Sequence, residues 1–285
     1  MSWQGHLQLT YRLDAHGADG APRTVAHDRH IGPLRVLQRL YPEGDAICHH
    51  VLVHPPGGIV GGDELRIDAH LGPGTHALIT TPGATRFYRS RGAVARQDVT
   101  LHVADGARLE WLPLETIAYD GCEAHNRLVV RLDGDAEAIG WDILALGLPA
   151  ADAAWTHGSY RQHAEIQDTW LDRALIRADD HLLLDSASGW GGRRVLATLW
   201  LAAGAPMPAP RRHTLIEAAR SALTENGNSA HNLTQGVTSP QDRLIVVRVM
   251  GDRVEPVQTL VRQIRSHWRE LAWSLPGHVP RIWGT

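Results

Sequence analysis

The sequence predicts a mainly β protein in which many short strands are coiled or layered, with two α-helices in its C-terminal half. Three observations support this fold class. Apolar and polar residues alternate with a period of two through most of the first 180 residues. Glycine- and proline-rich turns separate these runs. Apolar residues spaced three and four apart, which are typical of helices, occur only in the last third of the chain. Because no long linker divides the chain, we expect residues 1–285 to form a single domain.

The first predicted strand lies in the segment GHLQLTYRL near the start of the chain. Its alternate residues Leu7, Leu9, Tyr11 and Leu13 share one face, while polar residues share the other. A turn-rich segment follows, and the run AICHHVLVH then leads as a further strand into the glycine-rich centre of the chain.

Residues 54–92 combine prolines with the pairs Gly57-Gly58 and Gly61-Gly62, so we expect a rigid surface built of turns and short strands. The runs LRIDAHL and THALITT within it alternate as half-buried strands do. A phosphate-binding loop is the alternative for the paired glycines, but it would need a following helix and usually a lysine. Because a strand pattern follows instead, the sequence favours turn geometry.

Three turns show a weak internal repeat, since Gly74, Gly106 and Gly134 each precede a strand-like run. The spacings are 32 and 28 residues. A period near 30 with strand-only units indicates a coiled or layered β architecture. Ordinary β-turn chemistry explains the same glycines equally well.

The helical signals lie in segments 205–226 and 255–273. The first has a proline-rich entry and Thr214 as its possible N-cap. Its apolar face comprises Leu215, Ala218, Ala219, Ala222 and Leu223. The apolar face of the second comprises Val257, Leu260, Val261, Ile264, Trp268 and Leu271. Segment 157–186 reads as alternating strands.

Composition excludes several classes of protein. A net charge of -3, with no lysine, argues against a nucleic-acid-binding protein. No run of about 18 apolar residues is present, so no membrane span is expected. The first residues alternate like a strand instead of forming a signal peptide, and two cysteines are too few for a disulfide framework. A cytoplasmic location is therefore expected.

The residues Cys48, His49, His50 and His54 are candidate metal ligands close together in the sequence. Thiolate and imidazole donors suit nickel, copper or zinc. Because His49 and His50 are adjacent on a strand, they point to opposite faces, and only one can join His54 or Cys48. The alternative is a set of surface histidines on a half-solvated strand.

Acidic residues are scattered through apolar strands at Asp63, Glu64, Glu110, Glu115, Asp120 and Asp142. No nucleophile elbow, zinc-protease motif or serine-histidine-acid pattern accompanies them, and salt bridges to arginine explain most of them. Asp142 is different because it lies between Trp141 and Ile143, where a charge is costly unless it is paired or used.

The strings HPPGGIVGGDELRID, TTPGATRFYRS, LEWLPLETI, GWDILALG and the terminal PRIWGT closely resemble, in the same order, the UreD (also called UreH) family of urease accessory proteins. This resemblance implies a non-enzymatic chaperone with a β-helix-like layered fold. It implies UreF, the GTPase UreG and the urease structural subunits as partners, and nickel as a transient cargo with no tightly bound cofactor.

The resemblance further implies an internal polar passage for nickel, and it assigns Asp63, Thr85, Tyr88, Asp142 and Glu115 to the wall of that passage. Hydrated divalent cations move well between weak oxygen sites along a pore. We expect partner binding at the C-terminal third, through Trp268, Arg281 and Trp283, because the second helix is amphipathic and the tail carries an aromatic anchor. The alternatives are a stand-alone histidine-rich metal-binding protein and a metallohydrolase.

Overall fold

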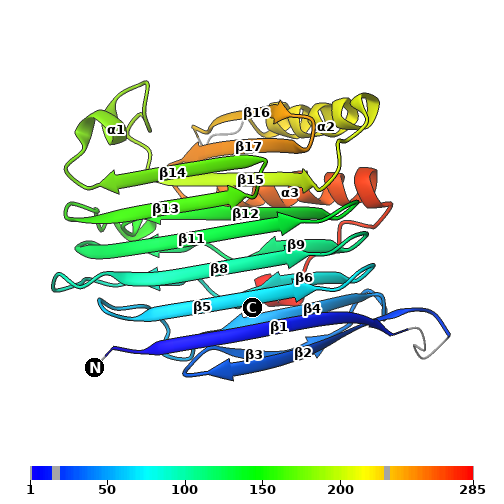
Figure 1. Ribbon diagram of the computed structural model, residues 1–285. Coiled ribbons are helices and arrows are strands. Elements are labelled where there is room, and N and C mark those ends of the chain that lie inside the picture. Colours follow the sequence, from blue (N-terminus) through cyan, green and yellow to red (C-terminus); the bar gives the residue numbers. More distant parts are fainter. Residues whose placement is uncertain (1, 15–19, 228–231, 285) are drawn as a thin grey trace.

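The computed structural model describes residues 2–14, 20–227 and 232–284. Strands contain 49% of the residues and helices 18%, which confirms the mainly β class. Two β-sheets are stacked face to face, and the two long helices lie against the far side of the second sheet (Figure 1). The resulting layers are sheet A, sheet B and the helices.

Sheet A has seven strands among the described residues. In spatial order they are β14 (Trp170–Arg177), β13 (Gly158–Ile166), β11 (Cys122–Leu132), β8 (Ala95–Val103), β5 (Glu64–Leu71), β1 (Gln4–Asp14) and β2 (Arg23–Ile31). Sheet B has ten strands in the same part of the chain. Its main order is β16 (Thr234–Gln241), β17 (Leu244–Gly251), β15 (Val195–Ala203), β12 (Glu137–Leu146), β9 (Arg108–Leu112), β6 (His76–Thr80), β4 (Ile47–Val53) and β3 (Arg35–Leu40), with β7 (Thr85–Phe87) and β10 (Thr116–Ala118) branching from β12.

From β4 to β13 the chain passes back and forth between the two sheets, and the short strands β7 and β10 of sheet B follow β6 and β9 before the chain returns to sheet A. Successive strands within each sheet are parallel, as in β5–β8–β11 of sheet A and β6–β9–β12 of sheet B. This is a β-solenoid-like arrangement, and it confirms the coiled, layered architecture expected from the sequence.

The predicted repeat forms the corners of these coils. Gly74, Gly106 and Gly134 all have positive φ angles, of 69°, 67° and 53°, a conformation that favours glycine. The three turns stack, because the amide of Gly74 donates to the carbonyl of Asp105 and the amide of Asp135 donates to the Asp105 carboxylate at 2.7 Å. The spacing of about 30 residues therefore corresponds to one coil.

Two apolar cores follow from the layering. One lies between the sheets and includes Leu9, Tyr11, Leu101 and Trp200. The other lies between sheet B and the helices and includes Trp141 and Trp268. Alternate residues of each sheet B strand thus enter different cores, which is why β4, β6 and β12 are almost continuously buried.

Helix α2 (Ala209–Gly227) begins five residues before Thr214, so the prediction of Thr214 as N-cap is wrong. Pro210 fits the first helical turn, and Thr214 Oγ1 donates back to its carbonyl at 3.0 Å. Helix α3 (Val254–Trp273) buries the predicted face from Val257 to Trp268, whereas Leu271 is exposed. Within the region read as strands, His181–Asp185 forms the short helix α1.

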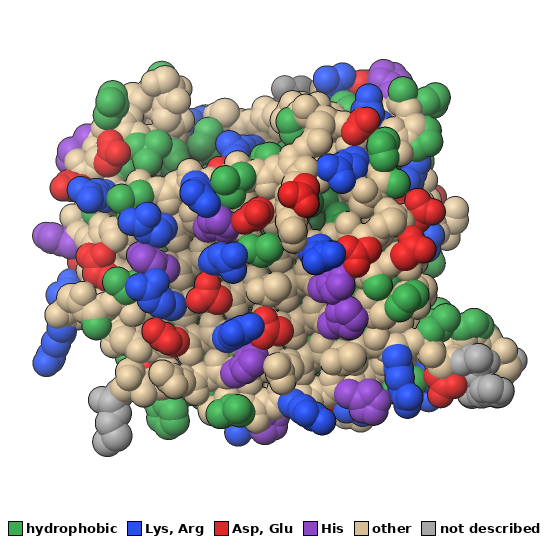
Figure 2. Space-filling model, in the orientation of Figure 1, with side chains coloured by type: hydrophobic (Ala, Val, Ile, Leu, Met, Phe, Trp, Pro, Cys, Tyr) green, Lys and Arg blue, Asp and Glu red, His purple; other side chains and the backbone are tan. Residues whose placement is uncertain are grey.

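The outer face of sheet A carries intermixed arginine, histidine and acidic side chains (Figure 2). Cross-strand and neighbouring pairs such as His6–Asp68, Arg66–Asp68 and His102–Asp133 cover this face. None of the helices in the described ranges is long and apolar enough to span a membrane.

Candidate functional site

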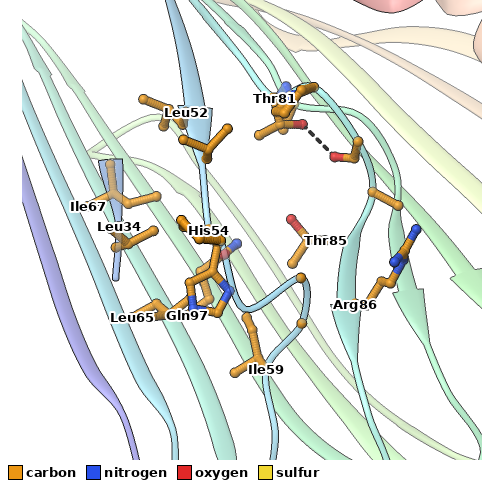
Figure 3. A pocket seen from close by; sticks show the side chains of 18 of the residues that line it. Leu34, Leu52, His54, Ile59, Leu65, Ile67, Thr81, Thr85, Arg86 and Gln97 are labelled. Carbon is orange, nitrogen blue, oxygen red and sulfur yellow. Dashed lines mark hydrogen bonds between the residues drawn. The ribbon is translucent and has the colours of Figure 1, made fainter. Parts of the chain in front are cut away.

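A cavity of about 260 Å³ opens at one edge of the space between the sheets. Its lining comes from segments 52–59 and 81–86 and from Leu34, Leu65, Ile67, Gln97, Trp111 and Pro113. In Figure 3 Leu34, Leu52 and Ile67 form one wall, while Thr81, Thr85 and Arg86 lie on the other. The glycine-rich centre of the sequence therefore builds the mouth of this cavity.

The mouth is held by close backbone packing. The amide of Ile59 donates to the carbonyl of Arg86 at 2.7 Å, and the amide of Tyr88 donates back to Ile59 at 2.9 Å. A Cβ atom added at Gly58 would lie 2.1 Å from the Tyr88 ring. Glycine is thus required at position 58 so that the loop can lie directly on Tyr88.

Polar side chains continue from the cavity across the interior, and we call this set the polar file: Gln97, Asn126, Gln162, Asp142, Thr198, Arg248 and Asp172. Gln97, which lines the cavity, donates to Asn126 at 3.2 Å. Asn126 lies opposite Gln162 on β13, and Gln162 donates to Asp142 at 2.8 Å.

The polar file then continues along sheet B to the opposite edge of the interior. Asp142 lies beside Thr198 of β15, and Thr198 lies beside Arg248 of β17. Arg248 donates to Asp172 of β14 at 2.6 Å in a partly exposed ion pair. A path of polar groups therefore joins the cavity to the far edge of the sheets.

Asp142 is the carboxyl group at the centre of the polar file. Burial raises its pKa to about 6, with a further increase from the nearby Asp172 and a decrease from the Gln162 hydrogen bond. Although the carboxyl is surrounded by protein, the residue retains some accessible surface. Such a combination is expected where a side chain borders an internal space of the size of water.

One further polar atom of this region lacks a partner in the described part of the chain, since Nε2 of His54 is buried without a hydrogen bond. The hydroxyl of Tyr160 is also buried and forms no hydrogen bond of good geometry, although the side chains of Asn126 and Thr116 lie close enough to lower its pKa slightly. Burial, followed by the charge of Asp142, raises the Tyr160 pKa well above its usual value, so this phenol is neutral. Buried polar groups are normally satisfied by protein or ordered water, and water between the sheets is the expected partner here.

Asp63 lies outside the polar file, in the turn before β5. It is 2% exposed, and its carboxylate accepts from the amides of Trp3 at 2.7 Å and Val60 at 3.1 Å. The family resemblance assigns Asp63 to the wall of a nickel passage, whereas its carboxylate is bound by these backbone amides. Asp63 thereby fixes the N-terminal strand to the loop at the cavity mouth.

The other predicted passage residues occupy different places. Thr85 lines the cavity, and Tyr88 packs on Gly58 and on Tyr119, with ring centroids 4.9 Å apart. Burial lowers the pKa of Arg262 in α3, and the charge of the half-buried Glu115 partly opposes this shift. The structure thus brings Thr85 and Asp142 to the interior between the sheets.

The four candidate metal ligands of segment 48–54 do not converge. Cys48 and His50 face the space between the sheets, where the Tyr11 hydroxyl lies 2.6 Å from Nδ1 of His50. Burial raises the pKa of Cys48 to about 11 and lowers that of His50 to about 4. His49 faces the opposite core and His54 the cavity. The half-solvated strand considered as an alternative is wrong, because both sheet faces of β4 are buried.

On that opposite face, His49 meets Glu43 and His278, and one donor atom from each lies within 4.8 Å of the others. It is the only such group of three or more among the residues described. Glu43 is also paired with Arg269 at 2.7 Å. The sequence pattern singled out His49 but not the other two, because His278 is distant in the chain and Glu43, six residues before His49, lies in a turn outside the histidine run.

Glu110, one of the scattered acids, is fully buried beneath α3 and paired with Arg265 and Arg269. Burial opposes its ionisation, but these cations, led by Arg265, together with the His76 hydrogen bond lower its pKa to about 2. The sequence signal for this buried ion pair was the presence of two arginines, four residues apart, on the apolar side of α3.

The proposed partner residues also differ in exposure. Trp268 is fully buried, and its Nε1 donates to the carbonyl of Leu215 at 2.9 Å, so it joins α3 to α2. Trp283 folds back onto the chain, where Nε1 donates to Thr80 Oγ1 at 2.8 Å and the ring packs on Trp141. Arg281 is exposed.

The sequence is similar to known proteins over nearly its whole length. The model of the family described as "UreD urease accessory protein" matches residues 4–284. A urease accessory protein UreD from Leptothrix cholodnii is 59% identical over the full length of both chains. Proteins of the same name from Variovorax paradoxus and Methylibium petroleiphilum are each 51% identical, again over the full length of both chains.

Proposed function

The chain belongs to the UreD family of urease accessory proteins, and from this premise we propose that it is a scaffold through which nickel reaches urease. In this proposal it links apo-urease to UreF and to the GTPase UreG, in the cytoplasm. Nickel enters at one edge of the interior between the sheets and moves along the polar file. The protein catalyses no reaction and holds nickel only transiently.

The observation that carries the passage proposal is the continuity of the polar file between two edges of an otherwise apolar core. Its side chains offer oxygen atoms from amides, a hydroxyl and carboxylates. Oxygen donors of this kind bind hydrated divalent cations weakly enough to release them. A metal-storage module would instead need a tight cluster of ligands.

Asp142 supplies charge to the centre of the polar file at neutral pH, because a pKa near 6 leaves its carboxyl mostly ionised above pH 7. Its protein partner is the neutral amide of Gln162, so its charge is not cancelled by an adjacent arginine. A passing cation would therefore be attracted to it more strongly than to a carboxylate already in an ion pair.

The chemistry near the polar file gives no support to the alternative of a metallohydrolase. A metallohydrolase needs a metal ion held by several converging ligands, with an open position for a water molecule. The polar file contains amides, a hydroxyl, an arginine and two carboxyls, and none of its members belongs to the group of three ligand types found among the described residues. The two cysteines are buried, and burial raises the pKa of each to about 11.

For the partners, Arg281 is the proposed contact that remains exposed, whereas Trp268 and Trp283 act first inside the fold. We therefore propose that any role of the two tryptophans in partner binding is indirect, through the position of α3 and the tail.

Co-purification tests the scaffold proposal. The chain is co-expressed with UreF, UreG and the urease subunits, and complex composition and nickel-dependent urease activity are measured with and without it. We expect a complex containing UreF and urease, and activation that depends on the chain. Equal activation in its absence, or failure to co-purify with either partner, would reject the proposal.

A further inference from the structure

Two side chains of the β3–β4 hairpin meet one from the C-terminal segment on the face of sheet B that the helices cover. Glu43 follows β3, His49 lies on β4, and His278 lies beyond the end of α3. Nε2 of His49 is 2.8 Å from Oε1 of Glu43, and the rings of His49 and His278 meet edge to face with centroids 5.5 Å apart. Donor atoms of all three lie within 4.8 Å of one another.

We propose that Glu43, His49 and His278 bind a divalent transition-metal ion. Two imidazoles and one carboxylate are a common ligand set for zinc and also suit nickel. Three protein ligands leave further coordination positions for water. A small inward movement would bring the three donors to coordination distance, because atoms bound to one metal at about 2.1 Å lie roughly 3–3.5 Å apart.

A second observation points to a ligand at this place. Nε2 of His278 is buried, and it has no hydrogen-bond partner in the described part of the chain. A bound ion is one explanation for such an atom, and this atom belongs to a side chain of the three-residue group.

The segment that carries His278 is held by two buried arginines of α3. Arg269 donates to the carbonyl of Pro276 at 2.7 Å, and Arg265 donates to the carbonyl of His278. Arg269 also holds Oε2 of Glu43 at 2.7 Å, which leaves Oε1 directed to His49. Supporting contacts of this kind orient the ligands of metal sites.

The surrounding charges indicate an exchangeable ion. Glu43 and Glu110 already balance Arg265 and Arg269 in this buried region. A divalent cation adds positive charge near Arg269, which lowers affinity relative to a structural metal site. The site lies across sheet B from the polar file, so the inference does not depend on the passage or on any partner.

The test is titration of the full-length chain with Ni²⁺ by calorimetry, and with Co²⁺ by visible absorption, at pH 7.5. The chain has 18 histidines, so weak background binding is expected. His278→Asn should remove the strongest binding event, weakening Ni²⁺ affinity roughly tenfold or more, and should lose the Co²⁺ absorption. His213→Asn, on the exposed side of α2, is the control and should leave both signals unchanged.

His49→Gln should have the same effect as His278→Asn, with circular dichroism confirming the fold of each variant. Because His278 is only half-buried, its variant remains informative if the buried His49 variant unfolds. Unchanged Ni²⁺ affinity and Co²⁺ absorption in folded His278→Asn would overturn the proposal. Failure of co-purification with UreF or urease would not affect it.

Discussion

Glu110 and Asp142 are two buried carboxyl groups on the neighbouring strands β9 and β12, and they face opposite sides of sheet B. Glu110 faces α3, and the arginines there hold its pKa at about 2. Asp142 faces sheet A, and burial raises its pKa to about 6. One sheet thus holds two acids under opposite electrostatic conditions.

The different partners of the two carboxyl groups indicate a structural role for Glu110 and a functional role for Asp142. Glu110 has cations on both of its oxygens, so its charge stabilises the docking of α3. Asp142 has a neutral amide as its partner, so its charge destabilises the folded protein at neutral pH. A buried acid kept without a cation is a candidate for function.

Glu110→Gln should have the largest effect on stability. The substitution leaves Arg265 and Arg269 in the core with too little negative charge, and breaking a buried ion pair costs about 3–5 kcal/mol of unfolding free energy. Urea denaturation measures this cost. Glu217→Gln, which removes an exposed pair with Arg220, is the control and should cost less than about 0.5 kcal/mol. A loss below 1 kcal/mol for Glu110→Gln would mean that the network is not structural.

Asp63→Ala should follow, because the amides of Trp3 and Val60 would lose their acceptor. A hydrogen bond to a charged group contributes at least about 1.5 kcal/mol, so losing two such bonds should cost about 3 kcal/mol in the urea midpoint analysis. Asp63→Asn keeps one acceptor oxygen and should lose less. Equal stability of the Ala variant and the wild type would show that Asp63 does not fix the N-terminal strand.

Asp142→Asn should instead stabilise the protein at neutral pH. A raised pKa means that the folded state binds the Asp142 proton more tightly than the unfolded state, so its contribution falls as pH rises from about 4 through 6. Removing the carboxyl should therefore stabilise the protein by about 2.5 kcal/mol more at pH 7.5 than at pH 4. The measurement is thermal or urea unfolding of both proteins across this range. A pH-independent difference would contradict the raised pKa.

Trp283→Phe should have the smallest effect. It removes the Nε1 donor to Thr80 but keeps a ring against Trp141, so we expect a loss of about 1 kcal/mol. A double-mutant cycle with Thr80→Val isolates this hydrogen bond. A coupling energy near zero would mean that the tail docks through ring packing alone.

Much of the fold followed from local patterns. The strand alternation of residues 5–13, the turns at Gly74, Gly106 and Gly134, and the apolar face of α3 each have a short-range cause that a single sequence shows. The helix start at Ala209 was missed because a threonine inside the helix mimicked a cap.

The polar file was less predictable than the fold, because its residues come together only when successive strands stack in the two sheets. Asn126, Gln162 and Thr198 come from three strands in two sheets, and no local spacing connects them. The available signal was a polar residue at an inward position of an alternating strand, as with Gln162 between Tyr160 and Ala164. Asp142 was identified because its neighbours in the sequence are themselves apolar, whereas the backbone partners of Asp63 depend on tertiary structure.

The central claim, that nickel moves along the polar file, is tested most directly by the nickel content of urease matured with the Asp142→Asn chain. The yield of the complex with UreF and urease is measured in the same preparation, and Glu165→Gln on the outer face of β13 serves as the control. We expect an unchanged complex yield and nickel content several-fold below that obtained with the wild-type chain or the control. Unchanged nickel content at unchanged complex yield would contradict the passage.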